Sequence, residues 1–410
     1  MIIKVMPKVL VVGCGLTGGG VFHYLKNLIP NQFFTFYEKA NSVAGRMARV
    51  SYKDAQCDVG AQYITKSSTE FDDIYQNLIN NNVLTELTFI VDGMKDEHKL
   101  KKHYMSIQGL ASITESFLEP VNHLIKYNTL LEELNILSTG EIQAISSRST
   151  SNNRDLVIIT EIYDIVILTL PTTKITELKG NFRDYMSTSN NDKPSFIDTI
   201  QAVKYSSRYA LALFYEPHTN TLLQDIRWGA KYVFDDDIIR YISIENRKSG
   251  GHNSDLSPLS ILIHTSIPYG IQNENTDNNI IKQQILAHLY AILPPLSNDT
   301  PVYTELVYWK ESQVSKPFNW FDLDLPKHSA IFPTTSSSSS SAAAAAAAIS
   351  PISGDITADT IEVVTEEDKM GKGEGGGMLV FCGDYFTESN FEGCMRSAQS
   401  AAEDIRARLA

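Results

Sequence analysis

Cysteine is scarce in this chain of 410 residues, which contains only Cys14, Cys57, Cys382 and Cys394. They form no Cys-x-x-Cys pair and no Cys/His spacing of the kind that binds zinc, so neither a metal site nor a thioredoxin-like centre is expected. Cysteines of this kind usually pack as small apolar side chains in a protein core. The sequence therefore predicts no bound metal.

Long hydrophobic runs and an excess of positive charge are also missing. No apolar stretch approaches the roughly 18 residues that a membrane span requires. The formal net charge is −13, and no basic patch offsets it, so neither nucleic acid nor an anionic membrane is expected as a partner. Cleaving the apolar N-terminus as a signal peptide would destroy the motif described next. We expect a cytoplasmic protein, with unconventional export left open.

A glycine pattern near the N-terminus is the most informative feature that is present. Gly13, Gly15 and Gly18 follow an apolar run, and a second apolar strand ends in Glu38. Gly13 permits a tight turn from strand to helix, Gly15 lets a diphosphate approach the backbone, and Gly18 lets the helix pack on the strand. Glu38 is placed to bind a ribose hydroxyl. The helix that begins near Leu16 directs free N–H groups at the diphosphate, so a bound ADP moiety is predicted.

Two further segments favour FAD, because FAD enzymes usually wrap their cofactor with distant parts of the chain. In the first, residues 44–47, Gly45 allows close approach and Arg46 can pair with a diphosphate. The second, residues 379–393, is predicted to form a strand, a turn at Asp384 beside the ribityl chain, and a helix N-terminus. The dipole of that helix could stabilise negative charge on the flavin.

Together with the middle of the chain, these segments resemble the renalase family of the flavin amine oxidase superfamily. The other similar segments are residues 58–65, 163–171, 205–216, 241–246, 262–270 and 309–314. Ala44 and Cys382 depart from the family pattern, since many relatives carry glycine at the first position and glycine is also expected at the second. The resemblance implies FAD as the cofactor and an α/β fold. In that fold a discontinuous Rossmann-type FAD-binding domain is interleaved with an α+β substrate domain that is mainly antiparallel sheet.

The motifs and the resemblance together predict a set of cofactor-binding residues. They are Gly13, Gly15, Leu16, Thr17, Gly18, Glu38, Lys39, Gly45, Arg46, Met47, Gly60, Ala61, Gln62, Tyr63, Gly383, Asp384, Asn390, Phe391 and Gly393.

The predicted domains follow from where these motifs lie. Residues 1–65, 104–171 and 378–410 are assigned to the FAD-binding domain, and residues 66–103 and 172–333 to the substrate domain. Strand-like runs such as residues 210–215, 240–244 and 260–265 suit an antiparallel sheet that covers the flavin. Residues 334–377 contain six consecutive serines and seven consecutive alanines, and are predicted to be a disordered surface insertion.

The resemblance also implies an activity. It is the oxidation of isomeric dihydronicotinamides (α-NAD(P)H and misreduced NAD(P)H) to β-NAD(P)⁺, with O₂ reduced to H₂O₂. A dihydropyridine expels hydride by the push of its ring nitrogen, so the reaction needs a flat slot rather than a catalytic base. No catalytic residue is assigned, and the substrate-slot candidates are Tyr63, Arg208, Tyr209, His264 and Trp309, with Tyr205, Tyr241 and Tyr269 as further aromatic residues.

Other interpretations stay open at this point. Each slot candidate taken singly is more often a core residue, and His264 lies in mid-strand between apolar neighbours. The alternative functions are a flavin monoamine oxidase and a non-catalytic FAD-containing signalling or binding protein. The sequence does not decide the oligomeric state.

Overall fold

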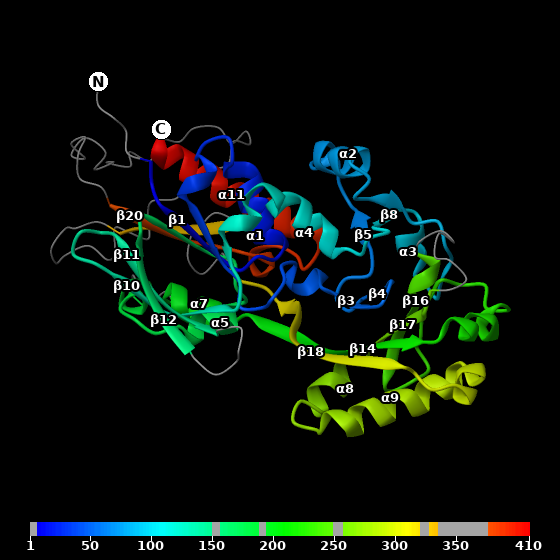
Figure 1. The fold of residues 1–410 in the computed structure, drawn as a ribbon. Helices are drawn as coiled ribbons and strands as arrows, with labels where there is room; N and C mark the ends of the chain where they lie inside the picture. Colours follow the sequence, from blue (N-terminus) through cyan, green and yellow to red (C-terminus); the bar gives the residue numbers. More distant parts are fainter. Residues whose placement is uncertain (1–5, 150–155, 188–193, 249–256, 320–327, 335–375) are drawn as a thin grey trace.

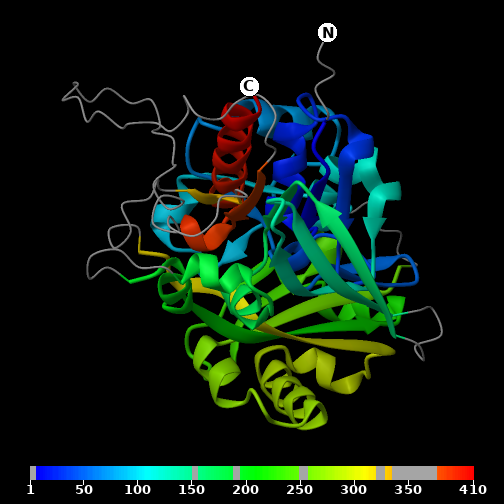
Figure 2. The same ribbon diagram turned by 90° about the vertical axis from the view of Figure 1, so that its left-hand side faces the viewer.

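The computed structural model describes residues 6–149, 156–187, 194–248, 257–319, 328–334 and 376–410. A parallel sheet flanked by helices lies above a long antiparallel sheet, and a second helical layer covers the far side of that antiparallel sheet (Figure 1). The view after a 90° turn shows the same layers from the side (Figure 2). The predicted disordered insertion at residues 334–377 lies almost entirely outside the described residues.

The parallel sheet has the strand order β19-β20-β13-β1-β2-β9, and all pairs are parallel except β19 with β20. Its strands are β1 (Val9–Val12), β2 (Phe34–Tyr37), β9 (Ile125–Lys126), β13 (Ile165–Leu168), β19 (Ser329–Thr334) and β20 (Gly377–Cys382). Continuous apolar runs such as Val9–Val12 suit these strands because helices and other elements cover both faces of a parallel sheet.

Three helices pack closely on one face of this sheet. They are α1 (Leu16–Leu25), α4 (Ala111–Leu118) and α11 (Phe391–Leu409) (Figure 1). A Cβ added to Gly20 would lie 2.9 Å from the Cβ of Ala398, which is closer than real Cβ contacts. The glycines of α1 therefore let the first and last helices of the fold approach backbone to backbone.

A three-stranded antiparallel sheet and three short helices cover the opposite face. The strands are β10 (Thr129–Ile136), β11 (Ile142–Ser149) and β12 (Leu156–Tyr163), and the helices are α5 (Thr172–Glu177), α6 (Phe182–Met186) and α7 (Phe196–Gln201). Ile175 and Phe182 are buried in one cluster with Leu10 and Val166 of the parallel sheet.

The long antiparallel sheet has the order β18-β14-β17-β16-β15-β7. Its strands are β7 (Val91–Asp92), β14 (Lys204–Tyr215), β15 (Ala230–Tyr232), β16 (Ile239–Ile244), β17 (Leu259–Thr265) and β18 (Tyr303–Lys316), and β7 alone pairs in parallel. On one face, leucines and tyrosines of β14 pack with the long helix α9 (Asn278–Ile292), near α8 (Ile267–Gln272). On the other face, Ala210 and Phe214 pack with β4 and Val59.

Smaller elements connect the two large sheets. A hairpin is formed by β3 (Arg49–Tyr52) and β4 (Ala55–Asp58), and a three-stranded sheet by β5 (Ile64–Lys66), β8 (Lys102–Met105) and β6 (Thr85–Glu86). Two helices, α2 (Asp72–Asn80) and α3 (Asp96–Lys99), complete this part. Within the described ranges, no helix is both long and apolar enough to cross a membrane.

Two parts of the predicted substrate domain pack on the parallel sheet. We assigned residues 172–333 to the substrate domain, but β19 pairs with β20 and α5–α7 pack on the parallel sheet. Apolar periodicity shows that a segment is buried without showing against which sheet, so the sequence could not reveal this. We propose that the substrate domain is built mainly on residues 204–316.

Candidate functional site

The predicted dinucleotide fingerprint lies between the end of β1 and the start of α1. Gly13 has φ +99°, which favours glycine, and a Cβ on Gly18 would lie 2.1 Å from the carbonyl oxygen of Gly13. At Gly15, by contrast, a Cβ would meet nothing nearer than the Cα of Gly45 at 3.9 Å. Gly13 and Gly18 are thus required by the fold, whereas Gly15 borders open space.

The N-terminus of α1 faces that open space. Among the described residues, no side chain accepts a hydrogen bond from its first N–H groups, and its first turn contains no acidic residue. Free N–H groups and the positive end of the helix dipole make such a terminus an anion-binding position. The geometry therefore fits a diphosphate at Gly15. Leu16 points into the core, and Thr17 is buried beside it.

Glu38 lies at the end of β2, where it closes the other side of the fingerprint. Its Oε2 accepts a hydrogen bond from the backbone N–H of Cys14 at 2.9 Å, and its Oε1 accepts one from Ala40 at 2.9 Å. Burial raises the pKa of this carboxyl, and the two N–H donors oppose the rise. Glu38 is therefore fixed next to the first glycine turn, while its neighbour Lys39 is exposed.

Replacing Glu38 with alanine is expected to weaken FAD binding by about 1.5 to 3 kcal/mol, because a charge-assisted hydrogen bond to the ribose is lost. Glu38→Gln retains an acceptor oxygen and should recover part of the affinity. Fluorescence titration of cofactor-free protein with FAD measures both changes. Unchanged affinity in Glu38→Ala, with the fold intact by circular dichroism, would refute the ribose assignment.

The loop at residues 44–47 lies against Gly15, with Ala44 and Gly15 forming a bridge. Ala44 has φ +94° and Gly45 has φ +53°, and the N–H of Ala44 donates to the carbonyl of Cys14 at 2.9 Å. The left-handed region costs a residue with a Cβ about 1 kcal/mol or more. This explains why glycine is usual at the position where we noted alanine as a departure. Met47 points into the core.

Ala44→Gly is expected to stabilise the protein by up to ~1 kcal/mol, because glycine adopts positive φ without steric cost. Urea unfolding of the two forms measures the difference. Ala48→Gly serves as the control, because Ala48 has φ −62° and should lose stability instead. A loss of stability in Ala44→Gly equal to that of the control would contradict the strain assigned to Ala44.

Arg46 and Asp384 join the two predicted cofactor motifs, which lie at opposite ends of the chain. Arg46 donates to both carboxylate oxygens of Asp384, at 2.8 and 2.6 Å. Burial alone would lower the pKa of Arg46, but the Asp384 carboxylate holds it above its usual value. Asp384 is buried, whereas the Arg46 side chain stays 32% exposed. The guanidinium is thus held in place by one carboxylate and still has an open side.

The helix start predicted at Asn390 is confirmed by α11. The Asn390 side chain accepts a hydrogen bond from the N–H of Gly393 at 2.7 Å, and a Cβ on Gly393 would lie 2.2 Å from the carbonyl oxygen of Glu388. Gly383 precedes Asp384 in the turn after β20. Phe391 is buried against Tyr75, so only its backbone is free to face a cofactor.

Residues 60–63 follow β4 and contact the backbone of Arg46. The N–H of Ala61 donates to the carbonyl of Arg46 at 2.9 Å, and a Cβ on Gly60 would lie 2.0 Å from that oxygen. The side chain of Gln62 turns inward, where its Oε1 accepts a hydrogen bond from the Nζ of Lys248 at 3.0 Å. The Gln62 side chain therefore anchors this segment to the buried Lys248, and only the backbone of Gln62 is free to face a cofactor.

Lys248 is a buried residue next to this segment that the sequence did not single out. Its buried ammonium lies 3.2 Å from Asp58 and 2.9 Å from Glu245, and both carboxylates are buried as well. Burial would lower the pKa of Lys248, but the two carboxylates raise it above its usual value. The ion cluster ties the end of β16 to the segment that carries Gly60. The only signal in the sequence was Asp58 at the start of a motif.

Several slot candidates converge on the carbonyl oxygen of Val59. Trp309 Nε1 donates to it at 2.8 Å and His264 Nε2 at 3.1 Å. Arg208 is paired with Trp309 across β14 and β18, and Tyr241 with His264 across β16 and β17. Tyr63 follows Val59 by four residues and joins Tyr232 through their hydroxyls at 2.7 Å. We call Tyr63, Arg208, Tyr241, His264 and Trp309 the Val59 cluster.

The structure places Tyr209 and Tyr269 away from the Val59 cluster. Both pack in the cluster on the α9 side of the long sheet, and the Tyr209 hydroxyl donates to the carbonyl of Asn273 at 2.7 Å. Alternation along β14 directs Tyr209 to the face opposite that of Arg208 and Ala210. Tyr205, near the beginning of β14, accepts a hydrogen bond from the N–H of Thr172 at 3.0 Å and lies apart from Val59.

Burial, with a further contribution from Arg208, lowers the pKa of His264 to about 3. In the unfolded chain this pKa is about 6.5, so the unfolded state binds more protons between pH 6.5 and pH 3. Stability is therefore lost as the pH falls through this window, by about 1.4 kcal/mol per unit well below 6.5.

His264→Gln is expected to remove this dependence. When the pH falls from 7 to 5.5, the free energy of unfolding of the parent protein should decrease by ~1 kcal/mol more than that of His264→Gln. Urea unfolding at the two pH values measures both decreases. The exposed His98 provides a control, since His98→Gln should leave the dependence unchanged. Parallel pH profiles for the parent and His264→Gln would contradict the assignment.

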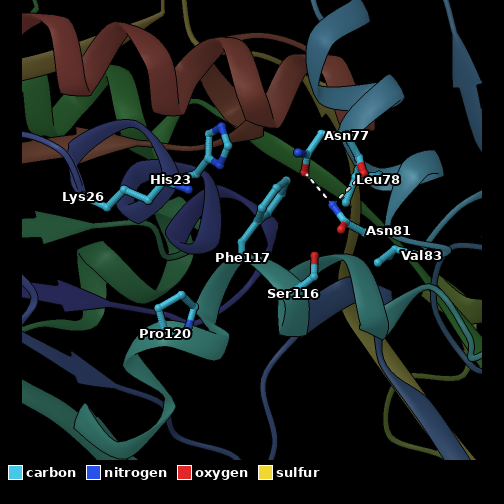
Figure 3. Close-up of a pocket in the computed structure, with 9 residues that line it drawn as sticks. All are labelled: His23, Lys26, Asn77, Leu78, Asn81, Val83, Ser116, Phe117 and Pro120. Carbon is cyan, nitrogen blue, oxygen red and sulfur yellow. Dashed lines mark hydrogen bonds between the residues drawn. The ribbon is translucent and has the colours of Figure 1, made fainter.

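A separate cavity of about 290 Å³ lies between α1, α2 and α4 (Figure 3). It is lined by His23, Lys26, Asn77, Leu78, Asn81, Val83, Ser116, Phe117 and Pro120. None of these residues is a predicted site residue. His23 and Lys26 lie at the C-terminal end of α1, away from Gly15. It is not part of the candidate site.

Comparison with known proteins supports a Rossmann-type dinucleotide-binding domain and the resemblance to the renalase family. A family profile described as an NAD(P)-binding Rossmann-like domain matches residues 11–78. The chain is 27% identical to renalase of Mus musculus over 408 residues, which cover 98% of this chain and 99% of that protein. The predicted resemblance to the renalase family is thereby confirmed.

Solved structures are similar in fold. A protein assigned as a protoporphyrinogen oxidase from Exiguobacterium sp. 255-15 matches with a TM-score of 0.61 and 12% identity, covering 98% of each chain. An engineered putrescine oxidase with redesigned cofactor binding matches with a TM-score of 0.59 and 12% identity, covering 98% of this chain and 99% of that one. These likenesses confirm the predicted α/β fold with a Rossmann-type domain.

Proposed function

We propose that this renalase-like chain is an FAD-dependent oxidase of isomeric dihydronicotinamide dinucleotides, which it converts to β-NAD(P)⁺ while O₂ becomes H₂O₂. The comparisons support an FAD-dependent oxidoreductase, whereas the substrate and the formation of H₂O₂ are our proposal. One observation favours this substrate class. The Val59 cluster contains the half-buried guanidinium of Arg208, whose Nε is buried, and a neutral histidine, and none of its described members forms an ion pair with a carboxylate.

The residues present fit FAD. The open space at Gly15 and the uncapped start of α1 suit the diphosphate, Glu38 suits the ribose, and the Arg46–Asp384 pair lies where the diphosphate and ribityl parts would follow. When bound, FAD supplies the acceptor for a hydride and the means of passing two electrons to oxygen.

The protein contributes position and electrostatics to this reaction. Tyr63 and Trp309, which are only partly buried, offer flat apolar surfaces for a planar ring, and the carbonyl of Val59 fixes the orientation of Trp309 and His264. His264 stays neutral at physiological pH because it is buried, so the cluster provides no proton acceptor of raised basicity. Since a dihydropyridine loses hydride by the push of its own nitrogen, none is needed.

Electrostatics disfavour an amine substrate. An alkylammonium ion would lie near the guanidinium of Arg208, and like charges in a buried site repel strongly. An amine oxidase would also have to remove the ammonium proton, for which the described part of this cluster offers no free carboxylate. A dihydronicotinamide carries no positive charge on its ring.

The test is an anaerobic stopped-flow titration of holoprotein with NADH equilibrated with its minor isomers. Rapid bleaching of the flavin band in proportion to the minor isomer, followed by one equivalent of H₂O₂ when O₂ is admitted, is the expected result. Benzylamine and putrescine are run in parallel. Bleaching by an amine alone would overturn the proposal in favour of an amine oxidase, and bleaching by no reductant would favour a non-catalytic protein.

A further inference from the structure

Arg208 has an unused hydrogen-bond donor in the Val59 cluster. Its Nη2 donates to the Oε1 of Gln313 at 3.1 Å, while its Nε is fully buried and finds no acceptor among the described residues. Leaving a buried donor without a partner costs about 1 to 3 kcal/mol, so nearly all such groups are paired in folded proteins. An unpaired Nε in a candidate substrate site therefore marks a position at which a bound ligand could supply the acceptor that the described residues lack.

The charges around Arg208 strengthen this point. Burial lowers its pKa, the nearby Arg240 lowers it further, and Tyr232 opposes them. No carboxylate among the described residues forms an ion pair with Arg208, whereas Arg46 on the other side of the site has Asp384. Arg208 thus presents a positive charge that the described residues leave uncompensated.

The surroundings define which acceptor fits. Arg208 is paired with Trp309 across the sheet, and the cluster also contains the rings of Tyr241 and His264. A planar ring that lies against these aromatic side chains could direct an oxygen-bearing substituent toward the guanidinium, whose fixed N–H groups suit a planar carbonyl or carboxylate.

We infer that Arg208 is a specificity-determining residue that binds the oxygen of the substituent on the substrate's pyridine ring. The inference rests on the proposed function and names the contact that selects the substrate class. It implies that the site binds a ring carboxylate more tightly than the corresponding carboxamide, because the hydrogen bond then joins two opposite charges. Ammonium-bearing rings are excluded by the same charge.

Ligand binding to oxidised holoprotein tests the inference without turnover. Flavin difference spectra are recorded with nicotinate, nicotinamide, benzylamine and inorganic pyrophosphate. The parent protein should bind nicotinate about tenfold more tightly than nicotinamide. Arg208→Gln should lose this preference, and Arg208→Lys should retain part of it. Arg148→Gln is the matched control, because Arg148 is exposed on β11, in a different sheet from Arg208, and should leave the preference intact.

The outcomes separate this inference from the proposed function. An unchanged nicotinate preference in folded, FAD-containing Arg208→Gln would overturn the role of Arg208, even if dihydronicotinamides still bleach the parent flavin. Loss of pyrophosphate binding alone would place Arg208 at the diphosphate and would also overturn it. Failure of every dihydronicotinamide to bleach the parent flavin refutes the proposed function, whatever the binding data show.

Discussion

Gly15→Val is expected to weaken FAD binding strongly while the protein still folds. The backbone at Gly15 has φ −80°, which valine adopts, and its Cβ would make only ordinary van der Waals contacts, 3.9 Å from the Cα of Gly45. The branched side chain would fill the position at which the diphosphate must approach the start of α1. We expect FAD affinity to fall by about 100-fold, or ~2.7 kcal/mol.

The stability of the cofactor-free form distinguishes this effect from general damage. Gly15→Val should change its free energy of unfolding by no more than about 1 kcal/mol, mainly because valine is a poor residue before a helix. Gly18→Ala is the matched variant, since its Cβ would lie 2.1 Å from the carbonyl of Gly13 and must push α1 away from β1. It should cost ~1 to 3 kcal/mol in the cofactor-free form.

FAD titration together with urea unfolding of both cofactor-free variants measures these quantities. If Gly15→Val bound FAD as tightly as the parent protein, the diphosphate could not lie at Gly15. If both glycine variants lost stability equally, the assignment of Gly15 to cofactor binding and of Gly18 to helix packing would be wrong.

Lys248→Met is expected to have the largest effect on stability. Methionine fills a similar volume but leaves Asp58 and Glu245 buried without a positive charge, and Gln62 without its donor. Removing one partner of a buried ion pair typically costs about 3 to 5 kcal/mol. Urea unfolding at pH 8 should show a loss of this size.

The pH dependence identifies the cause. Without Lys248, the two carboxyls take up protons more readily in the folded state than in the unfolded state, so the variant loses stability as the pH rises. Its deficit should be smaller at pH 5.5 than at pH 8, and adding Glu245→Gln should recover part of it. Lys53→Met removes an exposed lysine and should change little. A deficit that does not vary with pH would mean that lost packing, not charge, is responsible.

The sequence predicted those parts of the site that depend on local backbone geometry. Gly13, Gly18 and Asn390 each occupy the turn, close approach or helix start that their residue types require, and Ala44, which departs from the family pattern, has a positive φ. These features are set by neighbours in the chain. The predicted contacts of the cofactor residues with FAD remain proposals.

Contacts between remote residues were not predictable in the same way. Glu245 and Lys248 are three residues apart and would normally form a solvated pair, and only the fold brings them to Asp58. Tyr209 packs on the α9 side of the long sheet, and the irregular pairing of β14 with β18 near Arg208 makes the face of its side chain hard to predict from the sequence. Burial, charge compensation and strand register are properties of the assembled sheets.

The position of β20 has a consequence for how the protein is made. This strand, the last in the chain, lies inside the parallel sheet between β13 and β19, and Asp384, the partner of Arg46, follows it directly. During synthesis on the ribosome, the glycine turn and Glu38 emerge early, but β13 has no neighbour on that side until residues 377–382 have been added. We therefore expect Arg46 to gain its carboxylate partner only after residue 384 has been translated, and a chain truncated before β20 to expose an unpaired strand edge prone to aggregation.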